Sequence, residues 1–548
     1  MGAPNSTFVP SRYQSDFFTQ MASGREDILL SAVAGSGKTK SIEEGINRYP
    51  QAGATRILCT AFNKHIETEL KARQAQGLIP RSVTISTIHG LGYKVLASAC
   101  PSLNRANWVE GRKYTRLSEL LWGGVSFADL GFVDIEEAQK QKILAIDATV
   151  ELARLAMLTL TDTTDLDALA ELTARYDIEL PGNSALMEQV LVSVGTLVRW
   201  GREGAPTPDR HGLTYHPAQR ISFEDMVCLP VALDLPIPKF DLCLIDEAQD
   251  FNRAQQELLL RTKAPGGRAV WVGDRRQSIY AFTGADAQSF DRIKQMTGAR
   301  EMPLSICYRC SKSVVALAKN LVPAIEPSPS APAGLVAFVS EEELQEKIIS
   351  FWRANSREEF LVVCRTTAPL ISLAFKLLQR GTPAQVKGRD IGRSLLSLLD
   401  ELESSKGFSI ATWGDSTSAF KAVKLEALGR RKNPELLVAA FLDRMDSLEA
   451  VHEGLKVRTG GVTVEAIRGH LRHLFSDDSG PIVLSTIHKA KGLEAKRVGI
   501  LKPVLLPHPM AKLAEDLEQE RNLAYVAITR AKEELYIAGY LDLETLRG

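Results

Sequence analysis

The chain alternates short apolar runs with polar loops and stretches of helical spacing. In "EDILLSAVAGSGKTKSIEEGI" the run Ile28–Leu30 precedes a loop of small residues and then a helical pattern, which predicts a strand, a loop and a helix. The run Leu242–Ile245 in "FDLCLIDEAQD" predicts a second buried strand, and "RAVWVGD" predicts a third. A mainly helical pattern, "AQKQKILAIDATVELARLAML", lies between the first and second of these strands. Strands that alternate with helices are typical of α/β folds.

The loop Ala32–Thr39 has the spacing of a phosphate-binding Walker A sequence, with Ala32 in place of the first glycine. Its glycines allow close backbone approach, so that successive N–H groups can surround phosphate oxygens. We expect Lys38 to reach the β- and γ-phosphates and the Thr39 hydroxyl to bind Mg²⁺. The alternative, a glycine-rich turn with a surface lysine, is disfavoured by the strand before it and the helix after it. The residues expected to bind ATP here are Ala34, Gly35, Ser36, Gly37, Lys38, Thr39 and Lys40.

Two carboxylates follow the second predicted strand. Asp246 and Glu247 come directly after Ile245, and acids at the carboxyl edge of a parallel sheet can hold a metal ion and water. We expect Asp246 to bind Mg²⁺ through water, and Glu247 to orient and deprotonate the attacking water. An Asp-Glu pair alone is usually surface charge, but downstream of a phosphate loop it is a specific signal. Gln277, after the third strand, is expected to sense a γ-phosphate.

Composition limits the class of protein only loosely. The 548 residues predict three or four domains, and 45% apolar with 24% charged residues is typical of globular proteins. The net charge of zero argues against a permanently basic surface, although segments 429–435 and 466–475 could form local basic grooves or solvated faces. No apolar run reaches 18 residues and the N-terminus lacks signal-peptide features. We therefore expect a cytoplasmic protein without membrane contact, with a nuclear location left open.

The seven cysteines lie mostly in apolar contexts, which favours a reducing compartment over a disulfide framework. Cys307 and Cys310 have the spacing of metal ligands. No second pair follows at a usable distance, so zinc is not expected.

Nine short segments follow one another along the chain. They are Gln14, "AGSGKT", "AFNK", "STIHG", "DEAQD", "GDRRQSIYAFTGAD", "YR", "TIHKAKGLE" and "YVAITRAK". In order and wording they resemble the motifs of superfamily 1 helicases of the UvrD/Rep type, and "AFNK" and "DEAQD" are similar to the F-box helicase and phage-type branch. The resemblance implies an α/β fold of two RecA-like lobes, each a parallel sheet flanked by helices and each with helical insertions. It also makes Gln14 the residue expected to read adenine.

The word "STIH" occurs twice, each time after a β-branched apolar run. The resemblance implies that the copies lie at corresponding strand ends, one in each lobe. Hydroxyl and imidazole groups at such ends suit phosphate oxygens, which are the same in every nucleic-acid sequence. Alternatively, the two histidines only cap their strands. The residues expected to contact DNA here are Thr87, His89, Thr486 and His488.

The resemblance assigns further residues to the nucleotide. Arg309 of "YR" and Arg530 of "ITRAK" are the expected arginine fingers, which stabilise charge on the γ-phosphate in the transition state. Tyr308 is expected to stack on adenine, and Glu494 is expected to accept a hydrogen bond from the ribose. The arginines could instead be surface groups, which the apolar helical spacing around Arg530 disfavours.

Aromatic side chains can slide from base to base without reading sequence, and each stack contributes about 1–3 kcal/mol. Tyr280 and Phe282 occupy the places of the family's stacking aromatics, and Phe62 with Asn63 in "AFNK" is a further candidate pair for DNA. The family more often has Trp and Arg where this chain has Phe282 and Thr283, so one phosphate contact is expected to be missing. The alternative for Phe62 and Phe282 is a place in the core.

The resemblance also implies a division of the chain. The ATP-binding lobe comprises 1–92 and 221–303 with a helical insertion at 93–220, and the second lobe comprises 304–390 and 480–548 with an accessory insertion at 391–479. That accessory insertion is smaller than in the housekeeping enzymes, which puts duplex engagement in question. Because no further segment follows "ELYIAGYLDLETLRG", we expect any nuclease to be a partner protein.

Three functions remain open. The first is an ATP-dependent DNA helicase or translocase that uses Mg²⁺ and acts on single-stranded and tailed duplex DNA, with 3′–5′ polarity implied by the wording of Thr486–Glu494. The second is a nucleic-acid-stimulated motor or remodeller in a repair or defence assembly, which does not itself unwind; the small insertion and the neutral charge motivate it. RNA is a third, weaker option for the track, because phosphate gripping and stacking do not exclude ribose.

Overall fold

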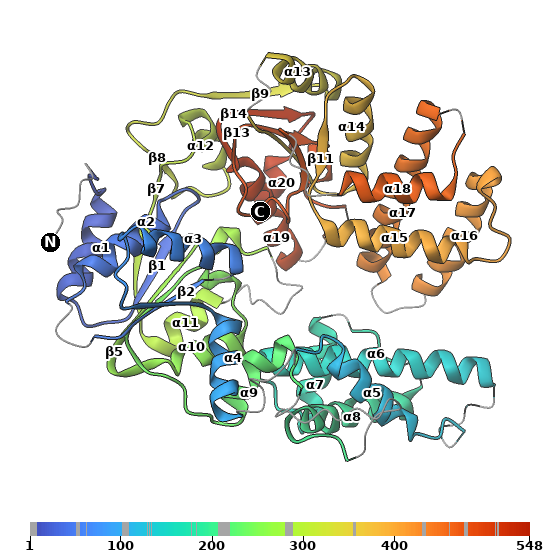
Figure 1. Ribbon diagram of the computed structural model, residues 1–548, viewed down its shortest axis with the longest axis horizontal. Coiled ribbons are helices and arrows are strands. Elements are labelled where there is room, and N and C mark those ends of the chain that lie inside the picture. Colours follow the sequence, from blue (N-terminus) through green and yellow to red (C-terminus); the bar gives the residue numbers. More distant parts are fainter. Residues whose placement is uncertain are drawn as a thin grey trace. The chain divides into compact units, whose positions relative to one another are not determined.

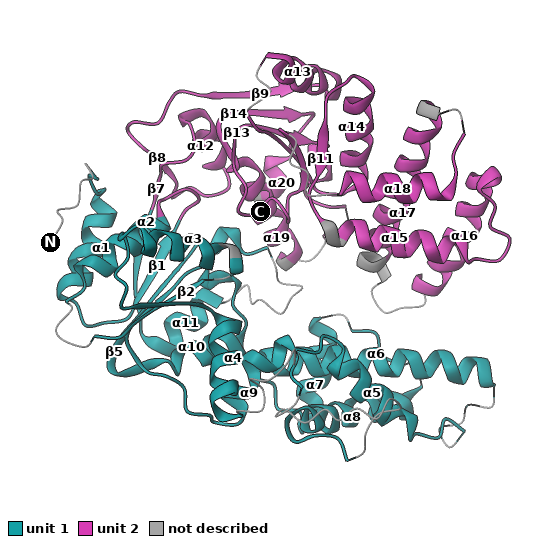
Figure 2. Cartoon of the chain, viewed as in Figure 1, with its two compact units in different colours: residues 1–32, 38–304 teal, residues 33–37, 305–548 magenta. Residues whose placement is uncertain are grey.

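The computed structural model describes residues 8–50, 55–61, 63–100, 109–128, 130, 132, 134–176, 178–181, 183–206, 220–279, 289–354, 358–429, 434–459, 461–475, 481–509, 511 and 514–547. The chain divides into two compact units (Figure 2). The first comprises Met1–Ala32 and Lys38–Leu304, and the second comprises Val33–Gly37 and Ser305–Gly548.

The first unit is built on a six-stranded parallel sheet with the strand order β3-β2-β4-β5-β1-β6. Alternate residues of β1 enter different cores, since Ile28 and Leu30 pack on one face and Leu29 packs on the other. Strands buried on both faces are typical of parallel sheets covered by helices. The strands are β1 (Ile28–Ala32), β2 (Ile57–Ala61), β3 (Val83–Thr87), β4 (Phe240–Ile245), β5 (Lys263–Gly273) and β6 (Arg300–Leu304).

Helices cover both faces of this sheet (Figure 1). One face packs against α1 (Arg12–Ser23), α2 (Lys38–Arg48) and α3 (Lys64–Ala75). The other packs against α4 (Ile88–Ala99), α9 (Phe223–Ala232), α10 (Arg253–Leu260) and α11 (Ser289–Thr297). Because α2 follows β1 and α3 follows β2 in a parallel sheet, both helices begin at the same edge of the sheet.

Between α4 and α9 the described residues form the helices α5 (Lys113–Gly123), α6 (Ile135–Thr159), α7 (Leu166–Arg175) and α8 (Ser184–Glu203). A fully buried ion pair fastens this insertion, with Lys113 Nζ 2.6 Å from Asp225 Oδ2. Lys113 also donates to the Gly201 carbonyl at 2.8 Å, and the Tyr114 hydroxyl donates to Asp225 Oδ1 at 2.7 Å. The contact joins α5 to α8 and α9, and burial beside Asp225 raises the pKa of Tyr114 well above its ordinary value.

The second unit contains another six-stranded parallel sheet, with the order β11-β12-β10-β13-β14-β9. Its strands are β9 (Leu335–Val339), β10 (Phe360–Cys364), β11 (Ala384–Val386), β12 (Ile482–Thr486), β13 (Ala495–Leu501) and β14 (Ala531–Ala538). A separate parallel pair, β7 (Ile306–Cys307) and β8 (Glu326–Pro327), precedes it in the chain. All residues of β10 and β12 are buried, as are those of β2 in the first unit.

Helices α12 (Lys312–Ala318), α13 (Glu341–Ala354), α14 (Ala368–Gln379), α19 (Ala514–Ile528) and α20 (Leu543–Arg547) accompany this second sheet. An insertion between β11 and β12 adds α15 (Arg389–Glu403), α16 (Trp413–Gly429), α17 (Pro434–Thr459) and α18 (Val464–Leu474). Leu395 of α15 and Met445 of α17 belong to the same core cluster as Leu370 of α14. The insertion therefore shares one core with its sheet.

The predicted fold class is confirmed, because the described part of each unit contains a six-stranded parallel sheet flanked by helices and a helical insertion. None of the described helices combines the length and apolar character that a bilayer span requires.

Candidate functional site

Three chain segments with expected roles follow neighbouring strands of the first sheet. The phosphate loop follows β1, Asp246 follows β4 and Asp274 follows β5, and the sheet order places β5 between the other two. In parallel sheets ligands bind outside the carboxyl ends of the strands. The fold therefore gathers these groups at the edge where a ligand is expected.

Lys38 and Glu247 lie in direct contact. The Lys38 Nζ donates to Glu247 Oε1 at 2.9 Å. Burial alone would lower the pKa of Lys38, but the carboxylates of Glu247 and Asp246 more than offset it, so that the pKa lies above its ordinary value. Glu247 has a left-handed backbone with φ 56°, which is unfavourable for a side chain of this kind and concentrates at functional sites. The ammonium is thus a fixed positive charge beside the expected catalytic base.

Two buried aspartates lie beside this pair. Burial raises the pKa of Asp246 to about 6 and that of Asp274 to about 6, although the nearby Lys38 ammonium opposes both shifts. Gln277, the expected γ-phosphate sensor, donates through Nε2 to Asp274 Oδ2 at 2.7 Å. With the Thr39 hydroxyl, the carboxylates supply the oxygen donors that Mg²⁺ prefers, so these residues fit the metal.

A glutamine that the sequence interpretation did not single out contacts the Glu247 carboxylate and the backbone at Asp274. Gln249 Nε2 donates to Glu247 Oε2 at 2.6 Å, and Gln249 Oε1 accepts from the Asp274 backbone N–H at 3.0 Å. Two features of the sequence could have indicated this contact. Gln249 lies two residues after Glu247 in "DEAQD", and a predicted strand ends just before Asp274. The two hydrogen bonds of Gln249 link the segment after β4 to the segment after β5.

The phosphate loop groups with the second unit over Val33–Gly37. Gly35 and Gly37 have φ of +66° and +78°, which glycine adopts without strain. Within that unit the Ala34 N–H donates to the Tyr525 hydroxyl at 2.9 Å, and the Gly35 carbonyl accepts from the Tyr308 N–H at 2.8 Å.

The loop also contains a buried hydroxyl with unused hydrogen-bonding capacity. Among the described residues the Ser36 hydroxyl oxygen has no hydrogen-bond partner, although it is buried. An orphaned hydroxyl between two left-handed glycines fits a phosphate oxygen.

Gln14 and Lys40, both expected at the nucleotide, bind other protein groups. Gln14 Oε1 accepts from the Ser11 N–H at 3.0 Å and Gln14 Nε2 donates to Ser41 Oγ at 3.1 Å, which ties α1 to α2. The Lys40 ammonium lies 2.6 Å from Glu43 Oε1 and 3.0 Å from Glu44 Oε1.

The second unit brings together three residues expected at the γ-phosphate and ribose. Arg309 Nε lies 2.5 Å from Glu494 Oε2. Arg530 is buried and donates through Nε to the Val526 carbonyl at 3.0 Å. Burial, with the nearby charge of Arg309, lowers the pKa of Arg530 to about 10. Tyr308, which is expected to stack on adenine, is 45% exposed.

The described residues of the first unit that are expected to contact DNA lie at or near the ends of neighbouring β-strands. Asn63 caps α3 by accepting from the Ile66 N–H at 3.0 Å, and Thr87 caps α4 by accepting from the Gly90 N–H at 3.0 Å. Ala61 at the end of β2 pairs with Thr87 at the end of β3. Burial lowers the pKa of His89. Three other candidates, Phe62, Tyr280 and Phe282, lie outside the described residues.

The two "STIH" words fold alike at the ends of β3 and β12. Ser86 Oγ donates to the Thr87 carbonyl at 3.1 Å, and Ser485 Oγ donates to the Thr486 carbonyl at 3.1 Å. Thr486 Oγ1 accepts from the Lys489 N–H at 3.4 Å, as Thr87 does from Gly90. The chain then continues as helix α4 in the first unit and as turns in the second.

His488 provides a pH test of this strand end. Burial, with the charges of Arg365 and Lys489, lowers its pKa to about 3. The unfolded chain binds a proton near pH 6.5 and the folded chain does not, so stability falls as the pH drops below about 6.5. At pH 5.5 the loss from this group is about 1.4 kcal/mol. In His488→Gln the decrease in Tm between pH 7.5 and 5.5, measured by calorimetry, should be smaller than in the unmodified chain. An equal decrease in both would contradict a lowered pKa of His488.

Two family models match the chain. The UvrD/REP helicase N-terminal domain matches residues 16–297, and the UvrD-like helicase C-terminal domain matches residues 463–541. Among curated proteins, F-box DNA helicase protein 1 of Schizosaccharomyces pombe is 25% identical over 97% of this chain and 58% of its own length. YjcD of Bacillus subtilis is 24% identical over 98% of this chain and 80% of its own length. The ATP-dependent DNA helicase PcrA of Staphylococcus epidermidis is 23% identical over 58% of this chain and 59% of its own length.

These matches confirm the resemblance seen in the motifs. The chain spans 58% of the length of the S. pombe relative.

Proposed function

Because the chain belongs to the UvrD/REP helicase family, we propose that it is an ATP-dependent DNA helicase that moves along single-stranded DNA with 3′–5′ polarity. The observation that carries the proposal is the arrangement at the edge of the first sheet. Lys38 follows β1 and the two carboxylates follow β4, while Asn63 follows β2 and Thr87 ends β3 of the same sheet. In this proposal one sheet carries both the nucleotide site and the site that binds the DNA strand.

The chemistry rests on residues of the first unit. Lys38 binds the β- and γ-phosphate oxygens as a point charge, and its contact with Glu247 keeps the two side chains close. Glu247 orients the attacking water and takes its proton, while Gln249 fixes the other carboxylate oxygen. A Mg²⁺ ion held by Thr39 and Asp246 would neutralise charge on the phosphates.

The second unit supplies the remaining charge in this proposal. Arg309 and Arg530 stabilise the transition state as arginine fingers, and their release from Glu494 and the Val526 carbonyl accompanies engagement of the γ-phosphate. Tyr308 stacks on adenine. Gln277 contacts the γ-phosphate, and its hydrogen bond to Asp274 couples that contact to the carboxylate.

The residues proposed to bind the DNA strand contact phosphate oxygens and do not distinguish one base from another. Thr87, Thr486 and the adjoining histidines bind phosphate oxygens, and the low pKa of His488 means that it acts there as a neutral donor. The side-chain amide of Asn63, on the exposed cap of α3, binds a further phosphate. Binding should therefore be independent of base sequence.

Polarity is tested with duplexes that carry a single-stranded tail at one end. We expect ATP-dependent unwinding of a 3′-tailed duplex at a rate at least tenfold above that of the matched 5′-tailed duplex. Glu247→Gln should unwind neither, which controls for trapping of spontaneously melted strands. Unwinding of the 5′-tailed form alone would refute the polarity.

One feature favours a second candidate, a strand-stimulated motor that does not unwind. Among the described residues, α15–α18 belong to the same core cluster as the second sheet, which does not favour engagement of a duplex by this small insertion as a separate body. ATP hydrolysis stimulated by single strands, without separation of even a short tailed duplex, would establish this alternative over the helicase.

A further inference from the structure

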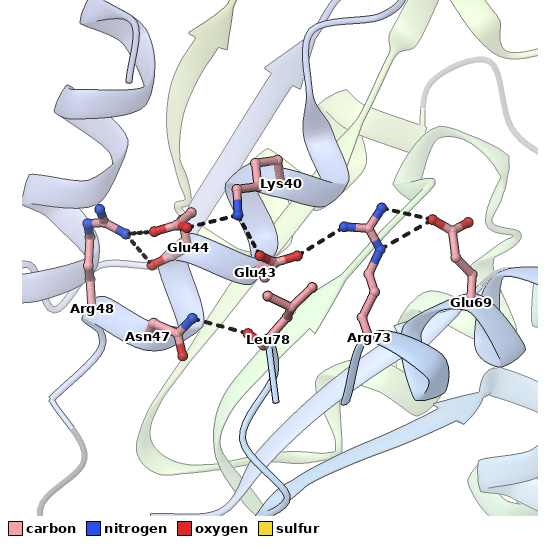
Figure 3. Close-up of polar contacts among 8 residues, drawn as sticks. All are labelled: Lys40, Glu43, Glu44, Asn47, Arg48, Glu69, Arg73 and Leu78. Atoms are coloured by element: carbon pink, nitrogen blue, oxygen red, sulfur yellow. Dashed lines mark hydrogen bonds and ion pairs between the residues drawn. The ribbon is translucent and has the colours of Figure 1, made fainter. Parts of the chain in front are cut away.

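A buried carboxylate lies on the helix that follows the phosphate loop. Glu43 of α2 is only 2% exposed, and two cations hold it (Figure 3). Its Oε1 accepts from Lys40 Nζ at 2.6 Å, and its Oε2 accepts from Arg73 Nη1 at 3.0 Å. Lys40 lies on the same helix, whereas Arg73 lies on α3. The carboxylate therefore bridges two helices.

The two helices begin at the two sites of the first sheet. Helix α2 starts with Lys38 at the end of the phosphate loop, and α3 starts after its cap Asn63. Arg73 is itself held on α3 by Glu69, at 3.0 Å. A second contact, from Asn47 Nδ2 of α2 to the Leu78 carbonyl at 3.2 Å, joins α2 to the segment after α3 (Figure 3).

Stability alone does not account for a charged bridge at this position. Removing a carboxylate from water is unfavourable, and well-packed apolar side chains in place of a buried ion pair are often equally stable or more stable. An ion pair differs in its directionality. The Lys40 contact lies within α2, whereas Glu43 Oε2 keeps its contact with Arg73 Nη1 only when α2 and α3 keep one relative position. Positioning of the helices is the property that an apolar pair would not supply.

We propose that Glu43 is a positioning residue that makes α2 and α3 move as one body, so that strand binding at Asn63 alters the geometry of Lys38. The inference rests on the proposed function, since it concerns stimulation of ATP hydrolysis by DNA. Glu43 touches neither the nucleotide nor the strand in this scheme. It acts through Lys40 at one helix and Arg73 at the other.

The same helix offers a matched control pair. Glu44 and Arg48 form an ion pair within α2, and Glu44 also contacts Lys40. Glu44 is 15% exposed and Arg48 is 38% exposed. This pair has similar chemistry and lies one position along the helix, but it does not reach α3.

The test compares ATPase rates of the full chain with and without a saturating single-stranded DNA oligonucleotide. In Glu43→Gln and Arg73→Gln we expect the DNA-stimulated kcat to fall about tenfold while the basal rate stays within twofold. Arg73→Gln leaves Lys40 on its two glutamates, so its KM for ATP should be unchanged. In the double variant the stimulated rate should fall no further than in either single variant, because each single variant already removes the Glu43–Arg73 ion pair. Glu44→Gln and Arg48→Gln should keep full stimulation.

Full stimulation in both Glu43→Gln and Arg73→Gln would overturn the inference while leaving the proposed function intact. Equal losses in the Glu44 and Arg48 variants would also overturn it, because the effect would then belong to α2 as a whole. A lack of stimulation in the unmodified chain would contradict the proposed function and this inference with it. Circular dichroism and Tm measurements on each variant separate these outcomes from loss of folding.

Discussion

Glu247→Gln is expected to lower kcat for ATP hydrolysis by about 10²–10⁴-fold, the contribution of a positioned general base. The amide keeps the shape of the side chain but cannot accept the water proton. Lys38 loses a carboxylate partner and keeps Asp246 and Asp274 nearby, so it remains charged and available to phosphate. ATP binding should therefore persist with Kd within about threefold. Steady-state ATPase assays and equilibrium titration with a fluorescent ATP analogue measure the two quantities.

Lys38→Ala is the matched comparison for this prediction. It removes the charge that binds the β- and γ-phosphates, so both ATP binding and turnover should be lost. Hydrolysis by Glu247→Gln at the unmodified rate would show that another group is the base. Loss of ATP binding in Glu247→Gln would show that the carboxylate holds the loop rather than the water.

Asp225→Ala is expected to reduce the free energy of opening the helical insertion by about 3–5 kcal/mol. The change leaves the fully buried Lys113 ammonium without a counter-charge and removes the acceptor of the Tyr114 hydroxyl. It also removes the acceptor of the Ser222 N–H at the start of α9. Hydrogen exchange of the amides in α5 and α9, under native conditions, measures this opening separately from the rest of the chain.

The control for Asp225 replaces the whole polar cluster. The triple variant Lys113→Met, Tyr114→Phe, Asp225→Leu contains no buried unpaired charge and should recover most of the lost protection. If Asp225→Ala exchanges as slowly as the unmodified chain, water reaches Lys113 and the pair is not isolated from solvent. If the triple variant is as unstable as the single one, shape rather than charge determines the site.

The sequence was informative where local pattern determines structure. Short apolar runs located β1, β4 and β5, and the residues after them gave Lys38, Asp246 and Glu247, because chemistry in parallel sheets gathers at strand ends. The repeated "STIH" word predicted two equivalent strand ends, and the serine and threonine hydrogen bonds agree with that. One local signal was overlooked: the spacing of Ser11 and Gln14 is that of a capping box, which the structure contains.

Contacts between residues far apart in the chain could not be read in this way. Lys113 and Asp225 are 112 positions apart, and Glu43 and Arg73 are 30 apart. Nothing in the spacing of either pair marks them as partners, since their meeting depends on how helices pack. The same holds for the Tyr525 hydroxyl on the Ala34 N–H. Such pairs become visible only when the elements are placed in space.

In the proposed function, hydrolysis at Lys38 and Glu247 depends on a nucleic-acid strand bound at the same sheet. The most direct measurement is the steady-state ATPase rate of the unmodified chain, titrated with single-stranded DNA, single-stranded RNA of the same sequence and blunt duplex DNA. We expect a saturable increase of at least tenfold with single-stranded DNA and a much smaller one with blunt duplex. A rate that no polynucleotide changes would contradict the account.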